Sequence, residues 1–228
     1  NLVITLREKA ETASPASEHR IISAAEFNQQ VPAAARKEYE QAVKLAGKGK
    51  LEAAIERFHK ALVIYPDYLM ARNDLGAQYL KLKRLDEAAE HFHIALEKSP
   101  KYFHPRLNLG LVLIEQKNYV DAIAQLRQAI ALDSTRPAAR LWLGFALLQT
   151  DDLPGAEREL TRALITGGAE FASAHYYLAQ VYLKRGDSAE AARALRAYLE
   201  EARKGEHVED ARRLLKQLEA GNRPAPRQ

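Results

Sequence analysis

The stretch LMARNDLGAQYLKLKRLDEAAEHFHIALEKSPKY, residues 69–102, decides the fold of this chain. It predicts two helices, at 69–82 and 85–98, joined by a short polar turn. Two antiparallel helices approach each other closely only where one of the facing side chains is small. Gly76 in the first helix and Ala88 in the second are residues of that kind. The stretch therefore predicts a helix hairpin.

The same pattern occurs five times along the chain, at spacings of 34 residues and once of 35. Such a period is typical of a solenoid in which each repeat packs on its neighbours. The small residue in the first helix of each hairpin is Ala42, Gly76, Gly110, Gly144 or Ala179. The alanine early in the second helix is Ala54, Ala88, Ala122, Ala156 or Ala191. A large apolar column in the second helix is Phe58, Phe92, Leu126, Leu160 and Leu195.

These columns divide residues 33–203 into five hairpins. The hairpins are predicted at about 35–68, 69–102, 103–136, 137–171 and 172–205. Their helices are predicted near 33–47, 51–65, 69–82, 85–98, 102–116, 119–132, 137–149, 153–166, 171–185 and 188–203. A solenoid needs an element that covers its last apolar face, so the amphipathic segment 206–220 is predicted as a capping helix. Residues 221–228 have no apolar face and are predicted to be a disordered tail.

The period and its order of small and large residues resemble the tetratricopeptide repeat. The second hairpin carries the resemblance best, with Leu75, Gly76, Tyr79, Ala88, Phe92, Ala95 and Pro100. The resemblance implies an all-α fold: an α-α superhelix, or right-handed solenoid, of five hairpins and a C-terminal capping helix. The third and fourth hairpins depart from the family, with Ser134 and Gly168 where proline is usual. The fifth has an extra residue near Gly167.

Residues 1–32 lie outside the repeat and are predicted as a lead-in segment. Leu2–Leu6 reads as a short strand, a polar linker follows, and a short helix is predicted from about Ala24 to Gln30. The region from Ile22 to Tyr39 looks like that of a group of bacterial, exported tetratricopeptide proteins with a small β-sandwich before the repeats. That resemblance implies that Leu2–Leu6 is the last strand of such a sandwich and that the protein is periplasmic or exported. A cytoplasmic location stays open.

Several kinds of chemistry have no support in the sequence. There are no cysteines, and no phosphate loop, nucleophile elbow or zinc motif is present. His91 and His93 lie two residues apart, which places them roughly 200° apart on a helix. They cannot chelate one ion, and both are expected to be solvated on the flanks of Phe92. The sequence therefore predicts no catalytic, cofactor-binding or metal-binding site, no cofactor and no enzyme, and its apolar stretches are too short to span a membrane.

The resemblance also implies a binding surface, because the family lays a peptide or partner helix along a concave face lined by the first helix of each hairpin. The register places these residues there: Tyr39, Asn73, His104, Leu107, Asn108, Leu111, Trp142, Phe145, Tyr176, Tyr177 and Gln180. Trp142 is the only tryptophan, and large exposed aromatic residues often anchor interfaces. The alternative is that Trp142 and Phe145 are covered by neighbouring helices or by the N-terminal segment.

A row of basic residues recurs at one position of the first helices. Arg72, Arg106 and Arg140 are separated by 34 residues, and His175 follows 35 later. Their aliphatic stems could pack while the guanidiniums reach water or acids of the second helix. Alternatively, the row recognises an acidic partner. The first interpretation is favoured.

The leading functional prediction is a non-catalytic scaffold that binds a protein or peptide in the concave groove. A nucleic-acid-binding helical repeat is the alternative suggested by the pI of 9.2, but the net charge is only +4 and the groove is mixed and apolar. No nucleic acid is therefore expected. Self-association through the apolar groove is a third possibility, and the oligomeric state is left undetermined.

Overall fold

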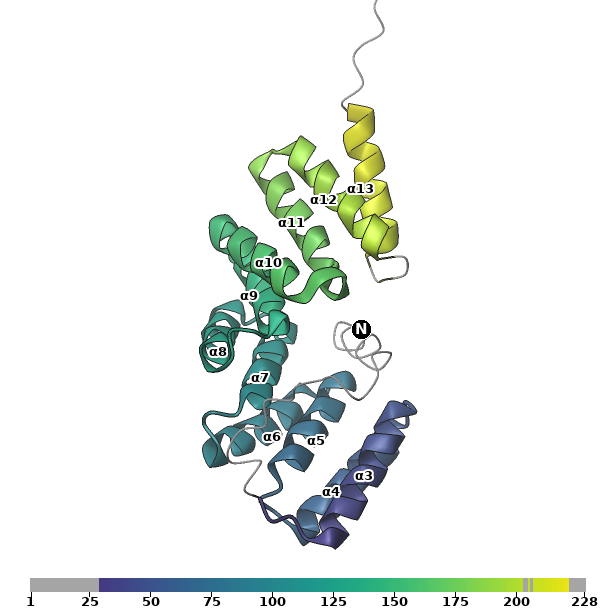
Figure 1. Ribbon diagram of the computed structural model, residues 1–228, viewed down its shortest axis with the longest axis vertical. Helices are drawn as coiled ribbons and strands as arrows, with labels where there is room; N and C mark the ends of the chain where they lie inside the picture. Colours follow the sequence, from purple (N-terminus) through teal and green to yellow (C-terminus); the bar gives the residue numbers. More distant parts are fainter. Residues whose placement is uncertain (1–28, 203–204, 206, 222–228) are drawn as a thin grey trace, which may run out of the picture. The chain divides into compact units, whose positions relative to one another are not determined.

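The computed structural model describes residues 29–202, 205 and 207–221. Within that part of the chain every regular element is helical and no strand occurs. The chain divides into two compact units, one ending at Leu132 and the other beginning at Asp133. Figure 1 shows the helices in chain order.

The first unit contains three helix hairpins (Figure 1). Its helices are α3 (Ala33–Gly47), α4 (Leu51–Ile64), α5 (Leu69–Lys81), α6 (Leu85–Lys98), α7 (Phe103–Glu115) and α8 (Tyr119–Leu132). The second unit contains two hairpins and one further helix. Its elements are α9 (Pro137–Gln149), α10 (Leu153–Gly167), the 3-10 turn η1 (Gly168–Phe171), α11 (Ser173–Arg185), α12 (Ser188–Glu201) and α13 (Val208–Gly221).

The predicted all-helical solenoid of hairpins is confirmed, and the ten hairpin helices begin and end within two residues of their predicted limits. The extra residue near Gly167 is accommodated by η1, where Gly168 has a φ of +59°. Gly221 is the last residue of α13, so the helix includes a residue that was predicted to belong to the tail. Gln29 and Gln30 are not helical. The rest of the predicted 24–30 helix, the 2–6 strand and residues 222–228 lie outside the described residues.

The small-residue column lies where the two helices of a hairpin touch. A Cβ added to Gly76 would lie 2.7 Å from Phe92 Cε1, and one added to Gly144 would lie 2.6 Å from Leu160 Cγ. Distances this short do not occur between real Cβ atoms and their neighbours. The large residues themselves are fully buried or nearly so: Phe58, Phe92, Leu126, Leu160 and Leu195. Interdigitation of small and large side chains therefore holds each hairpin together.

All five hairpin turns have the same hydrogen-bond pattern, which is that of a Schellman motif. In the third hairpin the Asn118 N–H donates to Leu113 O at 2.8 Å, and the Lys117 N–H donates to Ile114 O at 2.9 Å. The motif needs a left-handed residue after the first helix. That residue is Gly49, Lys83, Lys117, Asp151 or Gly186, with φ between +60° and +83°.

Replacing Lys117 by Gly is expected to stabilise the protein by about 0.5–1 kcal/mol, because an L-residue with a side chain pays for the left-handed conformation and glycine does not. Gln116→Gly is the matched control, since Gln116 has a φ of −76° in the right-handed region. It should lose about 0.5–1 kcal/mol. Urea unfolding of both variants checks the prediction, and a destabilised Lys117→Gly would contradict it.

The helix α13 closes the second unit as a cap. Val208 and Ala211 are buried, whereas Arg213 and Lys216 are exposed. Arg213 lies 34 residues after Ala179 and Lys216 lies 34 after Tyr182, which are the positions that receive the second helix in the fifth hairpin. A charged residue at each of these places leaves α13 without a face for a following helix. A polar outer face of this kind is what a terminal repeat requires.

None of the helices in the described residues has both the length and the apolar character needed to cross a membrane.

Candidate partner-binding face

In the first unit, four polar residues from three successive first helices are joined by hydrogen bonds; we call them the polar row. Tyr39 of α3 donates its hydroxyl to Asp74 Oδ2 of α5 at 2.8 Å. Asn73 Nδ2 donates to Asp74 Oδ1 at 3.1 Å, and Asn108 Nδ2 of α7 donates to Asn73 Oδ1 at 3.0 Å. The structure therefore brings together Tyr39, Asn73 and Asn108, which the sequence predicted on one face. The two pairs that join neighbouring helices are each 35 residues apart, one more than the repeat, and their side chains meet because consecutive first helices lie side by side.

The other predicted residues of this unit flank the polar row. His104 and Leu107 of α7 are half-buried, and Leu111 retains only 6% exposure. The His104 ring makes edge contacts with Tyr102 and Phe103, with ring centroids 5.8 and 5.5 Å apart. Of the two apolar residues predicted on this face, Leu107 and Leu111, only Leu107 therefore keeps a partly accessible side chain.

Trp142 of α9 is in the interior of the second unit, with 3% of its surface exposed. Its ring meets Phe145 edge-on at a centroid distance of 6.0 Å, and Phe145 lies 5.0 Å from Tyr177 of α11. The indole Nε1 is buried and finds no acceptor among the described residues. This burial favours the covered interpretation of Trp142 over an open anchor.

Tyr176 and Tyr177, predicted to bind a partner, pack against the chain's own cap. The Tyr176 ring stacks on His207 at a centroid distance of 4.2 Å, and its hydroxyl donates to Asp210 Oδ2 of α13 at 2.6 Å. Burial raises the pKa of Tyr176 well above its ordinary value, and the hydrogen bond to the Asp210 carboxylate raises it further. Tyr177 Oη lies 3.4 Å from His207 Nε2. Gln180 of the same face is half-buried.

Sequence reasoning missed His207 and Asp210 as the groups that meet these tyrosines. A signal was present, because Asp210 lies 34 residues after Tyr176, just as Asp74 lies 35 after Tyr39. Both pairs join equivalent faces of consecutive first helices, so α13 takes the place of a sixth first helix.

The three arginines of the basic row make the same contact in each hairpin. Each donates Nη2 to the backbone carbonyl six residues earlier, in the loop before its helix. The acceptors are Pro66 at 2.6 Å for Arg72, Pro100 at 2.8 Å for Arg106, and Ser134 at 3.3 Å for Arg140. The guanidiniums thereby tie the loop between hairpins to the start of the next helix.

A second contact joins the row to the second helix of the same hairpin. Arg106 Nη1 donates to Gln125 Oε1 at 3.2 Å. Arg140 Nη1 pairs with Glu159 Oε2 at 2.8 Å, and both side chains are largely buried. These contacts support the packing interpretation of the row over recognition of an acidic partner.

A cluster that the sequence did not indicate lies in the first unit, on the second-helix side. His91 of α6 stacks on Tyr79 of α5 at a centroid distance of 5.4 Å, and His59 Nε2 of α4 lies 2.8 Å from the Tyr79 hydroxyl. His93 is exposed as expected, but the prediction of a solvated His91 is wrong, because Tyr79 and His59 cover its ring. Among the described residues no group of three or more metal-ligating side chains gathers.

Burial, reinforced by Arg72, lowers the pKa of His91 from 6.5 to about 4. The unfolded chain therefore binds a proton at His91 more readily than the folded protein does. The contribution of the neutral His91 ring to stability is present in full above pH 6.5 and is lost as the pH falls from there through 4. We expect His91→Phe to reduce the loss of stability between pH 7 and pH 4.5, measured by urea unfolding. Part of the loss should remain, because burial also lowers the pKa of His59. Exposed His93→Phe is the control, and an equal effect from both variants would contradict the assignment.

Comparison with known families agrees with this architecture. One tetratricopeptide repeat model matches residues 39–103 and 146–207, which together make up more than half of the chain. A second tetratricopeptide repeat model matches residues 113–168. The chain therefore belongs to the tetratricopeptide repeat family, whose members are generally protein-interaction scaffolds.

Solved structures share the fold at low sequence identity. The solved chain of MamA from Desulfovibrio magneticus RS-1, which runs from residue 41 to the end, is 19% identical with a TM-score of 0.67, and the match covers 76% of this chain and 97% of that one. PilW, a type IV pilus biogenesis factor, is 21% identical with a TM-score of 0.71, over 83% and 92% of the two chains. YrrB, described as a TPR protein with an unusual peptide-binding site, is 20% identical with a TM-score of 0.62, over 82% and 92%. No curated protein matches significantly.

Proposed function

We propose that this protein is a non-catalytic scaffold that binds a peptide or a partner protein along the first-helix face of its first unit. The observation that carries the proposal is the polar row, in which the Tyr39 hydroxyl of α3, the Asn73 amide and Asp74 carboxylate of α5 and the Asn108 amide of α7 are hydrogen-bonded across three helices. Leu107 beside the row supplies apolar contact. The peptide-binding site in the description of YrrB, a protein of the same fold, is consistent with this use.

The chemistry of the row suits an extended backbone. A peptide presents N–H donors and C=O acceptors in alternation, and an asparagine amide offers one acceptor and two donors. Asn108 uses an N–H on Asn73, and in the described part of the chain no group donates to its Oδ1. Asp74 accepts from Tyr39 and Asn73 and has lone pairs left for a backbone N–H. Side chains of the guest would then be selected by neighbours such as Leu107.

We also propose that the protein is exported. Residues 22–39 resemble exported bacterial proteins that carry a β-sandwich before the repeats, and this region begins outside the described residues. Fractionation of the source cells tests it, because the protein is expected in the periplasmic or secreted fraction.

A selection of random 12-residue peptides on the immobilised protein tests the binding face. The selected peptides are expected to lose about tenfold or more in affinity for Asn108→Ala, a change of 1.4 kcal/mol or more. Gln128→Ala on α8, an exposed amide on a second helix, is the matched control and should bind as the wild type does. Equal affinities for all three proteins would overturn the proposed face. Thermal unfolding of each variant shows whether lost binding reflects lost folding.

A further inference from the structure

The chain enters the first unit beside the first-helix face, and Gln29 fixes the place. The backbone N–H of Leu69, the first residue of α5, donates to Gln29 Oε1 at 3.3 Å, and Gln29 Nε2 donates to the Asp67 carbonyl oxygen. The first N–H groups of a helix have no acceptor within that helix, so a side chain 40 residues earlier caps α5. Residues 21–28 are therefore joined to a point at the start of a first helix.

The polar row lies within reach of this point. Asn73 follows Leu69 by four residues, which is about 6 Å along a helix. Asn108 of α7 is hydrogen-bonded to Asn73 at 3.0 Å. The six residues that lead from Ser23 to Gln29 span up to about 20 Å when extended. Residues just before Gln29 can therefore reach both α5 and α7 along the row.

The sequence of residues 21–28, IISAAEFN, suits such a face. It contains two adjacent isoleucines and Phe27, and it lies outside the repeat. On the face, Leu107 is half-buried and Val43 of α3 is 38% exposed. Val43 lies 68 residues before Leu111 and so takes the same repeat position in the first hairpin. Contact between the segment and the face removes apolar surface of both from water, which favours docking.

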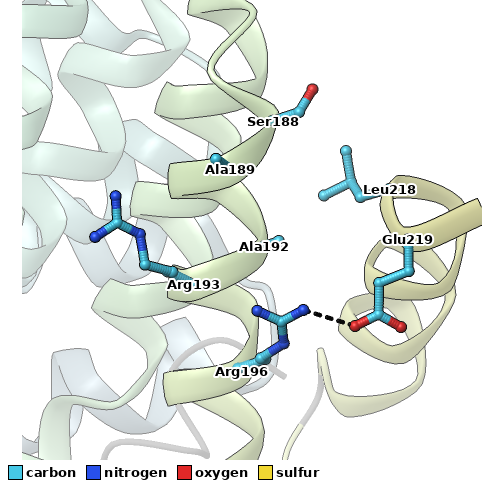
Figure 2. Close-up of a pocket in the computed structure, with 7 residues that line it drawn as sticks. All are labelled: Ser188, Ala189, Ala192, Arg193, Arg196, Leu218 and Glu219. Carbon is cyan, nitrogen blue, oxygen red and sulfur yellow. Dashed lines mark hydrogen bonds and ion pairs between the residues drawn. The ribbon is translucent and has the colours of Figure 1, made fainter. Parts of the chain in front are cut away.

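A recess in the second unit does not offer the same fit. It has a volume of about 400 Å³ and lies between α12 and α13, with Ala189 on the α12 side (Figure 2). Its arginines pair with acids of the same unit, Arg193 with Glu190 and Arg196 with Glu219. The segment before α3 is tied to the first unit instead, so the recess serves below as a control surface.

We propose that residues 21–28 dock on the first-helix face of the first unit and must leave it before a partner binds. This regulation rests on the proposed function, because the segment and the partner compete for one site. A tethered segment has an effective concentration on the order of millimolar, so it competes with a separate partner without binding tightly. Partner affinity falls in proportion to the fraction of molecules whose face is open.

Cysteine pairs test the docking itself, because the chain has no cysteine of its own. Ser23→Cys is combined in the full chain with Leu107→Cys on the face, with Ala124→Cys on α8, or with Ala189→Cys at the recess. Ala124 and Ala189 are exposed, so both control thiols are accessible. The 23–107 pair should form an intramolecular disulfide at least about tenfold faster than either control pair, since a disulfide needs adjacent Cβ atoms. Equal rates, a faster control pair, or a disulfide between two chains would overturn the proposal.

The double variant Ile22→Asp/Phe27→Asp tests the competition. It should bind the peptides selected for the first-helix face at least about tenfold more tightly, because aspartates at these positions disfavour an apolar contact and open the face. Val63→Asp/Val120→Asp adds the same two charges at exposed positions of α4 and α8 and should leave the affinity within about twofold. Lost folding cannot produce a gain of affinity, and an unchanged affinity in the Ile22/Phe27 variant would refute the competition.

The two experiments separate this inference from the proposed function. If Asn108→Ala binds the selected peptide as the wild type does, the proposed binding face fails, whereas the disulfide rates still decide whether residues 21–28 dock there. When both hold, a saturating amount of the selected peptide should slow the 23–107 disulfide at least about tenfold. An undiminished rate with the peptide bound would show that the segment and the partner do not share the face.

Discussion

Glu159→Ala is expected to destabilise the protein by about 3 kcal/mol, the largest loss from a single polar change. Glu159 is 6% exposed and pairs with Arg140, whose side chain is 12% exposed. Arg140 Nε is buried without a partner, so loss of the carboxylate leaves a buried guanidinium held by the Ser134 carbonyl alone among the described residues. An uncompensated buried charge costs far more than the net worth of the pair.

The matched control is Gln125→Ala, because Gln125 faces Arg106 at the same repeat position. Gln125 is neutral and half-buried, so we expect Gln125→Ala to lower the free energy of unfolding by about 1 kcal/mol. The double variant Arg140→Met/Glu159→Leu should recover most of the loss, since a packed apolar pair replaces the buried ion pair, and the other two partners of Glu159, Arg158 and Arg162, are exposed to solvent. Urea unfolding measures all three. A smaller loss for Glu159→Ala than for Gln125→Ala would contradict this account of the basic row.

Gly144→Val is expected to cost about 3 kcal/mol, because its Cβ alone would lie 2.6 Å from Leu160 Cγ and 3.2 Å from the Leu160 backbone nitrogen. Leu160→Ala by itself should cost about 3 kcal/mol through the cavity it leaves in a fully buried position. Combined, the two changes should cost less than their sum by about 1–3 kcal/mol, since the valine occupies part of the cavity.

Gly47→Val is the control for the glycine change, since nothing lies within 4 Å of a Cβ added to Gly47. It should cost far less than Gly144→Val. Additive losses in the Gly144–Leu160 cycle would show that the two residues are not in contact, and the assignment of the small-residue column to hairpin packing would then be wrong.

The sequence was sufficient for the hairpin register because that register rests on packing rules that repeat. Gly76, Gly110 and Gly144 mark close approaches, and a 34-residue period makes each assignment support the next. The position of the polar row followed from the same register, since Tyr39 and Asn73 lie 34 residues apart and Asn108 follows 35 later, on the same face of the next first helix.

The register does not show which residues of the predicted binding face remain exposed to solvent. Whether Trp142 is open or buried depends on every neighbour that covers it, and a repeat position carries no information on those neighbours. Tyr176 was assigned to a partner because the register does not show that α13 continues the row of first helices with Asp210. His91 was assigned to solvent because its cover comes from His59 and Tyr79 on two other helices.

Site-specific photo-cross-linking shows whether a bound partner touches the first-helix face of the first unit. A photoreactive phenylalanine analogue is placed at Leu107 on α7, and in a second protein at exposed Ala124 on α8. Both proteins are irradiated with a peptide selected on the wild type. We expect a covalent adduct at position 107 that excess unlabelled peptide removes, and none at position 124. An adduct at 124 alone, or at neither position while the peptide is bound, would contradict the claim.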